Sequence, residues 1–255
     1  MRIPCSLLWI AFAAAGCGNS TTARAPDSSA DQNADPAVPQ AMEPAPGGSE
    51  STAKPLPEPP PPPKRLAIAP LGEVAAADVG LAAESISRTY GWIVDVLPPQ
   101  DHPAAAWYAK RKRHRGEKIL DWLRPQLPRG ADRIMALTAA DISTTKPPHA
   151  DWGICGLADI SGAASVVSTF RIRKKMGGAT GEERAAQYEQ RLRDLTAHEF
   201  GHQLGLEHCP TRGCVMEDAK GTVSTFDRST GALCADCAAA LAEAGFPLPG
   251  AAPPL

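Results

Sequence analysis

The chain has 255 residues, a formal net charge of -2 at pH 7 and a hydrophobic content of 43%. This length permits one domain of ordinary size with extensions. The near-neutral charge provides no overall field that would draw the protein to nucleic acid, so nucleic acid is excluded as a partner.

The N-terminus has the features of a secretory signal. Arg2 precedes an apolar run at residues 7–15, and small residues lead from this run to Cys17. One positive charge, a short apolar core and small residues at its end are typical of a signal peptide. A cysteine directly after Ala-Ala-Gly resembles the lipobox of bacterial lipoproteins. We therefore expect residues 1–17 to be a lipoprotein-type signal with Cys17 lipidated, and a bacterial envelope protein that faces the periplasm or lies in the outer membrane. A plainly cleaved signal and an uncleaved anchor are the alternatives.

Residues 18–64 are rich in proline. Positions 20–64 contain 12 of the 26 prolines and no aromatic residue. Such a segment buries too little apolar surface to offset the entropy of ordering it. We expect it to be a disordered tether, followed by a folded domain at 65–246 and a disordered tail at 247–255.

The domain alternates expected strands with expected helices. Apolar, β-branched runs predict strands at 66–71, 92–97, 133–138 and 164–170. Helical periodicity predicts helices at 78–90 and 118–123, and a long helix at 182–204. Thr180-Gly-Glu-Glu183 fits a capping box at the start of the long helix. This alternation favours an α/β fold with a mixed sheet.

A histidine motif lies at the end of the long helix and reads His198-Glu199-x-x-His202-x-x-Gly205-x-x-His208. Residues four apart share one helix face, so His198 and His202 can reach one ion. A glycine at 205 can end the helix in the left-handed conformation, after which the chain returns His208 to the same ion. Three protein ligands plus a water are typical of a hydrolytic zinc site.

Glu199 is the candidate catalytic residue. It follows the first histidine but points to one side, so it can hold the zinc-bound water rather than the metal. Zinc lowers the pKa of that water, and Glu199 can take its proton as a general base and pass it to the leaving amine. The alternative is a zinc site without turnover, in a protein that acts as a binding or structural module of the envelope.

Four cysteines follow the histidine motif in two pairs. They are Cys209, Cys214, Cys234 and Cys237. Their spacing favours a second zinc, whose four thiolates would leave no position for water, so that this ion would be structural. In an oxidising compartment two disulfides are the alternative. Cys155 stands apart from them, either as a buried cysteine or as a thiolate that reaches and inhibits the catalytic zinc.

The histidine motif followed by Met216 resembles the metzincin clan of metallopeptidases. The cysteine directly after His208, with Cys214 and the Cys234-x-x-Cys237 pair, resembles the archaemetzincins within that clan. This resemblance implies a twisted mixed sheet over a long active-site helix, with a small C-terminal subdomain held together by the second zinc. It also implies that Met216 forms the Met-turn beneath the catalytic zinc, although the residue alone could be any core methionine.

Two segments outside the motifs have two interpretations each. In zinc peptidases an exposed edge strand before the metal helix aligns an extended substrate, and we expect this role for Val166, Val167, Ser168 and Thr169. An ordinary sheet strand is the alternative. The basic run Lys110–Arg115 is interpreted as a solvated loop or helix end, with contact to anionic lipid headgroups as the alternative.

The function expected from the sequence is hydrolysis of peptide or protein substrates by a monomer with two Zn²⁺ ions per chain. Endopeptidase and aminopeptidase action both remain open. The second needs an acidic group for the substrate amine, for which Asp151 and Glu207 are candidates.

Overall fold

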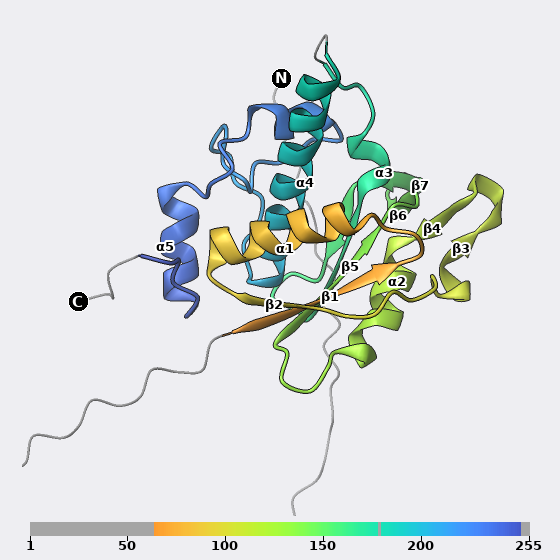
Figure 1. The fold of residues 1–255 in the computed structure, drawn as a ribbon, viewed down its shortest axis with the longest axis horizontal. Helices are drawn as coiled ribbons and strands as arrows, with labels where there is room; N and C mark the ends of the chain where they lie inside the picture. The colour runs from red at the N-terminus through yellow and green to blue at the C-terminus, as the bar shows by residue number, and fades with distance from the viewer. Residues whose placement is uncertain (1–63, 178–179, 251–255) are drawn as a thin grey trace, which may run out of the picture. The chain divides into compact units, whose positions relative to one another are not determined.

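The structure is a computed structural model that describes residues 64–177 and 180–250 (Figure 1). The expected signal peptide with Cys17, residues 18–63 of the expected tether and the last five residues lie outside the described residues. Within the described ranges, no helix combines the length and the apolar character needed to cross a membrane.

A five-stranded mixed sheet is the centre of the domain. Its strand order is β2-β1-β5-β9-β8. The strands are β1 (Arg65–Leu71), β2 (Ile93–Val96), β5 (Arg133–Thr138), β9 (Ala164–Ser168) and β8 (Gly156–Ala158). All pairings are parallel except that of β8 with β9. The inner strands β1, β5 and β9 are buried along nearly their whole length, because strands of a parallel sheet are covered on both faces.

Each face of this sheet has its own hydrophobic core. Side chains of alternate β1 residues, such as Leu66 and Ile68, pack with helices α1 (Ala76–Tyr90) and α4 (Gly181–Gln203). The opposite face packs against helix α2 (Gly116–Leu123). Figure 1 shows α1 and α4 together on one side of the strands. The expected mixed α/β architecture is confirmed.

The long helix α4 starts and ends as the sequence predicts. The Thr180 hydroxyl accepts a hydrogen bond from the Glu183 backbone N–H, and the Glu183 carboxylate accepts one from the Thr180 N–H, both at 3.1 Å. These two bonds satisfy donors that a helix start otherwise leaves unpaired. At the other end Gly205 has a φ of +100°, which turns the chain away from the helix axis.

The prediction that residues 166–169 lie on an exposed edge strand of the sheet is wrong. β9 lies between β5 and β8, so both of its backbone edges are paired, and all five of its residues are buried. Val166, Val167 and Ser168 therefore belong to an inner strand, and Thr169 already begins the short helix α3 (Thr169–Ile172). The edge is β8, which has only three residues and no apolar alternation to indicate a strand.

A second sheet was not predicted. Its order is β3-β4-β6-β7, and its strands are β3 (Trp107–Tyr108), β4 (Arg113–Arg115), β6 (Ile142–Lys146) and β7 (His149–Ile154). The basic run is partly inside this sheet, because Arg113 is only 8% exposed and its guanidinium lies 3.0 Å from the Asp151 carboxylate. The interpretation of Lys110–Arg115 as a solvated loop or helix end is therefore wrong for its last residues.

The remaining elements are short. They are η1 (Ala104–Ala106), η2 (Ala109–Arg111), η3 (Arg124–Gln126), η4 (Val223–Arg228) and α5 (Ala235–Glu243). After α5, Leu248 packs against the main core, and Pro249 lies so close to Gly91 that a side chain there would meet its ring. The expected tail boundary is corrected accordingly, because ordered packing continues beyond residue 246.

Candidate active site

The first two histidines of the motif lie on the last turns of α4 with their rings held in place. The Nδ1 atom of His198 is 2.8 Å from the Val215 carbonyl oxygen, and that of His202 is 2.6 Å from the Leu206 carbonyl oxygen. A carbonyl only accepts hydrogen bonds, so each Nδ1 carries the proton of a neutral imidazole. Each Nε2 is then left with a free lone pair.

These two lone pairs face each other. The Nε2 atoms of His198 and His202 are 3.1 Å apart. Burial lowers the pKa of His198 to about 3 and that of His202 to about 4, so both rings are neutral at pH 7. Two neutral acceptors at this distance repel each other unless a cation lies between them. Tetrahedral zinc with Zn–N bonds of about 2.1 Å places its nitrogen ligands about 3.4 Å apart, which the arrangement fits.

His208 completes the cluster. The turn at Gly205 brings it back, and one ligand atom from each of the three histidines lies within 4.8 Å of the others. Its ring is exposed, whereas those of His198 and His202 are buried, so the cluster opens on the side of His208. This geometry agrees with the sequence, which predicts that the side chains of His198, His202 and His208 converge.

Met216 packs directly against the metal-binding turn of α4. It is fully buried, and a Cβ at Gly201 would lie 2.5 Å from its sulfur. Glycine at 201 is what permits this approach between the two histidines. The Met216 carbonyl also accepts a hydrogen bond of 2.7 Å from the Cys209 N–H, which ties the methionine turn to the residue after His208. This position is the one expected of a Met-turn.

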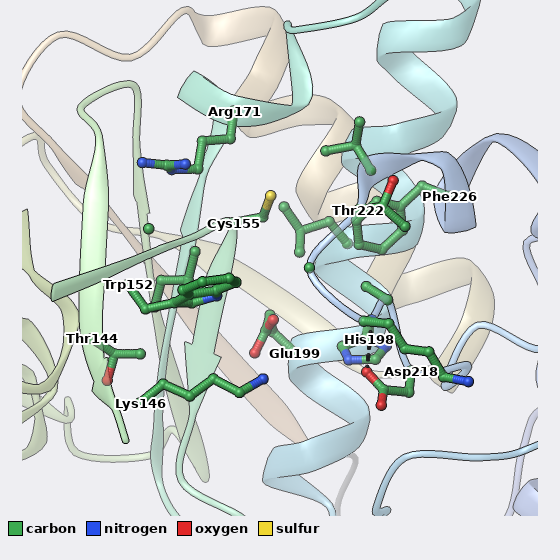
Figure 2. A pocket seen from close by; sticks show the side chains of 18 of the residues that line it. Thr144, Lys146, Trp152, Cys155, Arg171, His198, Glu199, Asp218, Thr222 and Phe226 are labelled. Atoms are coloured by element: carbon green, nitrogen blue, oxygen red, sulfur yellow. Dashed lines mark hydrogen bonds between the residues drawn. The ribbon is translucent and has the colours of Figure 1, made fainter. Parts of the chain in front are cut away.

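Glu199 faces a cavity of about 390 Å³. Glu199 is 6% exposed, and burial raises the pKa of its carboxyl to about 8. Gly156 of the edge strand β8 covers it, and a Cβ on Gly156 would lie 2.4 Å from the Glu199 Oε1 atom. Figure 2 shows the Glu199 side chain in the pocket with His198. The histidine cluster, the Glu199 carboxyl and the edge strand β8 therefore lie next to one another.

The pocket walls come from three segments that the motif does not include. They are the β6–β7 hairpin, the turn after α3 and the loop that follows Met216. Trp152 of β7 approaches that loop closely, because a Cβ on Gly221 would lie 3.2 Å from its ring. These residues could not be predicted from the sequence, because the hairpin has no apolar alternation and neither the turn after α3 nor the loop after Met216 carries a recognisable motif.

Cys155 also lines the pocket, but its environment favours a thiol. Burial, and then the charge of Glu199, raise its pKa to about 11. It is not part of the histidine cluster. Of the two candidate amine-binding acids, Asp151 is engaged by the guanidinium groups of Arg111 and Arg113, and neither it nor Glu207 lines the pocket.

The four paired cysteines form a second cluster with zinc-like geometry. The Sγ atoms of Cys209 and Cys234 are 3.6 Å apart, and those of Cys214 and Cys237 are 3.8 Å apart. Tetrahedral zinc with Zn–S bonds of about 2.3 Å places its sulfurs about 3.8 Å apart. A disulfide needs about 2.05 Å. The cluster has the spacing of four thiolates around one ion, and none of these cysteines is disulfide-bonded.

Comparison with known proteins agrees with this site. Residues 169–243, which hold both clusters, match the model of Peptidase family M54. The archaemetzincin of Haloarcula marismortui is 33% identical over 171 residues, which are 67% of this chain and 95% of that protein. The archaemetzincin of Halobacterium salinarum is 32% identical, over 68% of this chain and 96% of that protein.

Solved structures give the same result for the fold. The archaemetzincin of Archaeoglobus fulgidus, determined as a complex with malonate, has a TM-score of 0.56 and 28% identity, and the match covers 69% of this chain and 98% of that one. That of Methanopyrus kandleri has a TM-score of 0.57 and 26% identity, over 71% and 95%. The fold and the site thus define a zinc metallopeptidase, a hydrolase that acts on peptide or protein substrates. The chain belongs to the archaemetzincin family.

Proposed function

We propose that this peptidase cleaves its substrate with Glu199 as the general base at a zinc ion held by His198, His202 and His208. The observation that carries the proposal is the pair of unprotonated Nε2 atoms, 3.1 Å apart, beside a carboxyl that faces the cavity. A bound zinc ion supplies Lewis acidity, which lowers the pKa of a coordinated water and polarises the scissile carbonyl.

The chain contributes the proton transfers. Glu199 accepts the proton of the attacking water and then donates it to the amine that leaves. Burial favours the protonated carboxyl that donates in the second step, because it raises the pKa of Glu199 to about 8. A nearby cation lowers this pKa, so the metal-loaded carboxyl is the ionised form that a base requires.

Substrate alignment is assigned to β8. This strand pairs with β9 on one side only, and Gly156 at its start lies against Glu199. An extended peptide that pairs with the free side of β8 gains backbone hydrogen bonds and brings its own backbone past Glu199. The glycine leaves room for the carboxyl at the point where the scissile bond would lie.

A second, structural zinc is proposed for the cysteine cluster. The cluster joins the segment after His208 to the start of α5, so an ion there cross-links these two parts of the chain. Binding energy of this kind acts as folding energy. The protein as a whole is proposed to be a monomer, tethered to a bacterial envelope membrane through lipidated Cys17.

The catalytic proposal is tested by metal depletion and reconstitution. The purified protein is expected to cleave members of a mixed peptide library, to lose cleavage when a chelator removes the metal, and to regain it with one equivalent of zinc per histidine site. A protein that holds zinc at the histidines but cleaves no peptide would refute the proposed function. Such a result would leave the binding-module alternative.

A further inference from the structure

The active-site pocket has a rim of lysines that the catalytic chemistry does not use. The lysine rim consists of Lys146, Lys174, Lys175 and Lys220, all of which line the pocket and are exposed. Lys146 ends β6, the next two follow α3, and Lys220 lies in the loop after Met216. Positive charge therefore approaches the cavity from three separate segments.

This charge is not neutralised within the domain. None of the ion pairs formed between described residues includes a lysine of the rim. The fifth cation of the pocket, Arg171, differs because its guanidinium pairs with both oxygens of Asp141 at 2.7 and 3.0 Å. The only carboxylates among the lining residues are Glu199 and Asp218, and Asp218 accepts the backbone N–H of Lys220.

Aromatic rings hold two of these lysines in place without removing their charge. The Lys174 ammonium lies 4.4 Å from the ring centre of Phe170, and that of Lys146 lies 5.8 Å from the ring centre of Trp152. An aromatic face attracts a cation but leaves it charged. Figure 2 shows Lys146 and Trp152 on the same side of the pocket.

The turn that carries Lys174 and Lys175 is fixed by a buried arginine. Arg191 of α4 is fully buried and donates to the carbonyl oxygens of Ile172, Lys174 and Lys175. Its remaining donors bind the Asp227 carboxylate at 2.6 and 2.7 Å. Because all three carbonyls are anchored, the backbone of this turn is set and its lysine side chains remain at the rim.

We infer that the lysine rim selects peptides with acidic side chains on either side of the scissile bond. This inference rests on the proposed peptidase function and adds a substrate class to it. A peptide laid along β8 passes between Lys146 on one wall and Lys174, Lys175 and Lys220 on the others. Aspartate or glutamate there gains attraction at several positions, whereas lysine or arginine meets repulsion.

The expected size of the preference is modest for each residue. An exposed ion pair changes binding by about threefold, so two such pairings give a preference of about tenfold for an acidic over a neutral peptide. The preference should weaken with salt, because exposed charges are screened over about 10 Å at 0.1 M ionic strength.

Binding to the Glu199→Gln protein, loaded with zinc, tests the inference apart from catalysis. Three labelled peptides of equal length carry glutamate, glutamine or lysine at the flanking positions, and fluorescence anisotropy gives their affinities at low and high ionic strength. We expect the glutamate peptide to bind about tenfold more tightly than the glutamine peptide and the lysine peptide least tightly. In Lys146→Glu/Lys220→Glu the order should be lost or reversed.

The matched control is Lys110→Gln/Lys112→Gln, compared with Lys146→Gln/Lys220→Gln. Both pairs remove two exposed lysines, and Lys112 shares the left-handed backbone of Lys220, with φ of 49° and 46°. Only the rim pair should reduce the acidic preference. Equal affinities for the three peptides, or an equal effect of the control pair, would overturn the inference. If the variant protein binds the acidic peptide most tightly but the wild type cleaves no peptide, the inference about the lysine rim is supported and the proposed peptidase function is refuted.

Discussion

Gly156→Ala is expected to disable catalysis by displacing Glu199. A Cβ at this position would lie 2.4 Å from Oε1 and 2.5 Å from both Cδ and Cγ of Glu199. Ordinary contacts begin near 3.4 Å, so the carboxyl must move by about 1 Å. A misplacement of this size in a catalytic group can lower the rate by about 10²-fold. The φ of Gly156 is not in the left-handed region, so alanine adds no backbone strain.

The assay compares kcat on one peptide, zinc content and thermal unfolding for wild type, Gly156→Ala and Gly80→Ala. Gly80 lies in α1 with no atom within 4 Å of its added Cβ, so its replacement should leave the rate unchanged and stabilise the helix by up to about 1 kcal/mol. We expect about 10²-fold lower kcat for Gly156→Ala with both zinc ions retained. A wild-type rate in a folded, zinc-loaded Gly156→Ala protein would refute the assigned place of Glu199.

Two further predictions concern metal content and stability. Cys234→Ser/Cys237→Ser should reduce zinc from two ions to one per chain, as counted by mass spectrometry under native conditions, and lower the unfolding temperature. A wild-type protein with one zinc and no free thiol among these four cysteines would favour disulfides instead. Burial raises the pKa of Asp194 to about 6 from 3.8, and its Oδ2 has no partner among the described residues. Because the folded pKa is the higher one, its stabilising contribution is present below pH 4 and is lost as the pH rises through 6. Asp194→Asn should therefore gain on the order of 2 kcal/mol relative to wild type at pH 7 and less than half of that at pH 4.5, measured by urea unfolding, and equal effects at both pH values would contradict this.

Local patterns made the central sheet and the metal ligands predictable. The middles of parallel strands such as β1 and β5 are apolar because both of their faces are covered, and α4 has its capping box and its glycine stop. The three histidines and Glu199 could be placed because helical spacing alone brings the first ligands together. The cysteine cluster followed from spacing in the same way.

The second sheet and the substrate edge could not be predicted for a physical reason. β6 and β7 carry mixed polar residues on a partly exposed surface, so no alternation marks them, and β8 has only three residues. The prediction of an edge strand at Val166 and Val167 is wrong because a sequence shows a strand but not its neighbours in the sheet. Arg113 was taken for a solvated charge because its partners, Asp141 and Asp151, are distant in sequence. The lysine rim depends on the same long-range contacts.

The peptide cleavage rate of zinc-loaded Glu199→Gln tests the catalytic assignment most directly. Glutamine keeps the shape of the side chain but cannot accept the proton of water, and general-base catalysis contributes about 10²- to 10⁴-fold. With zinc at the histidines equal to that of wild type, we expect the rate to fall by at least about 10²-fold. A variant that cleaves as fast as wild type would contradict the role of Glu199 in this peptidase.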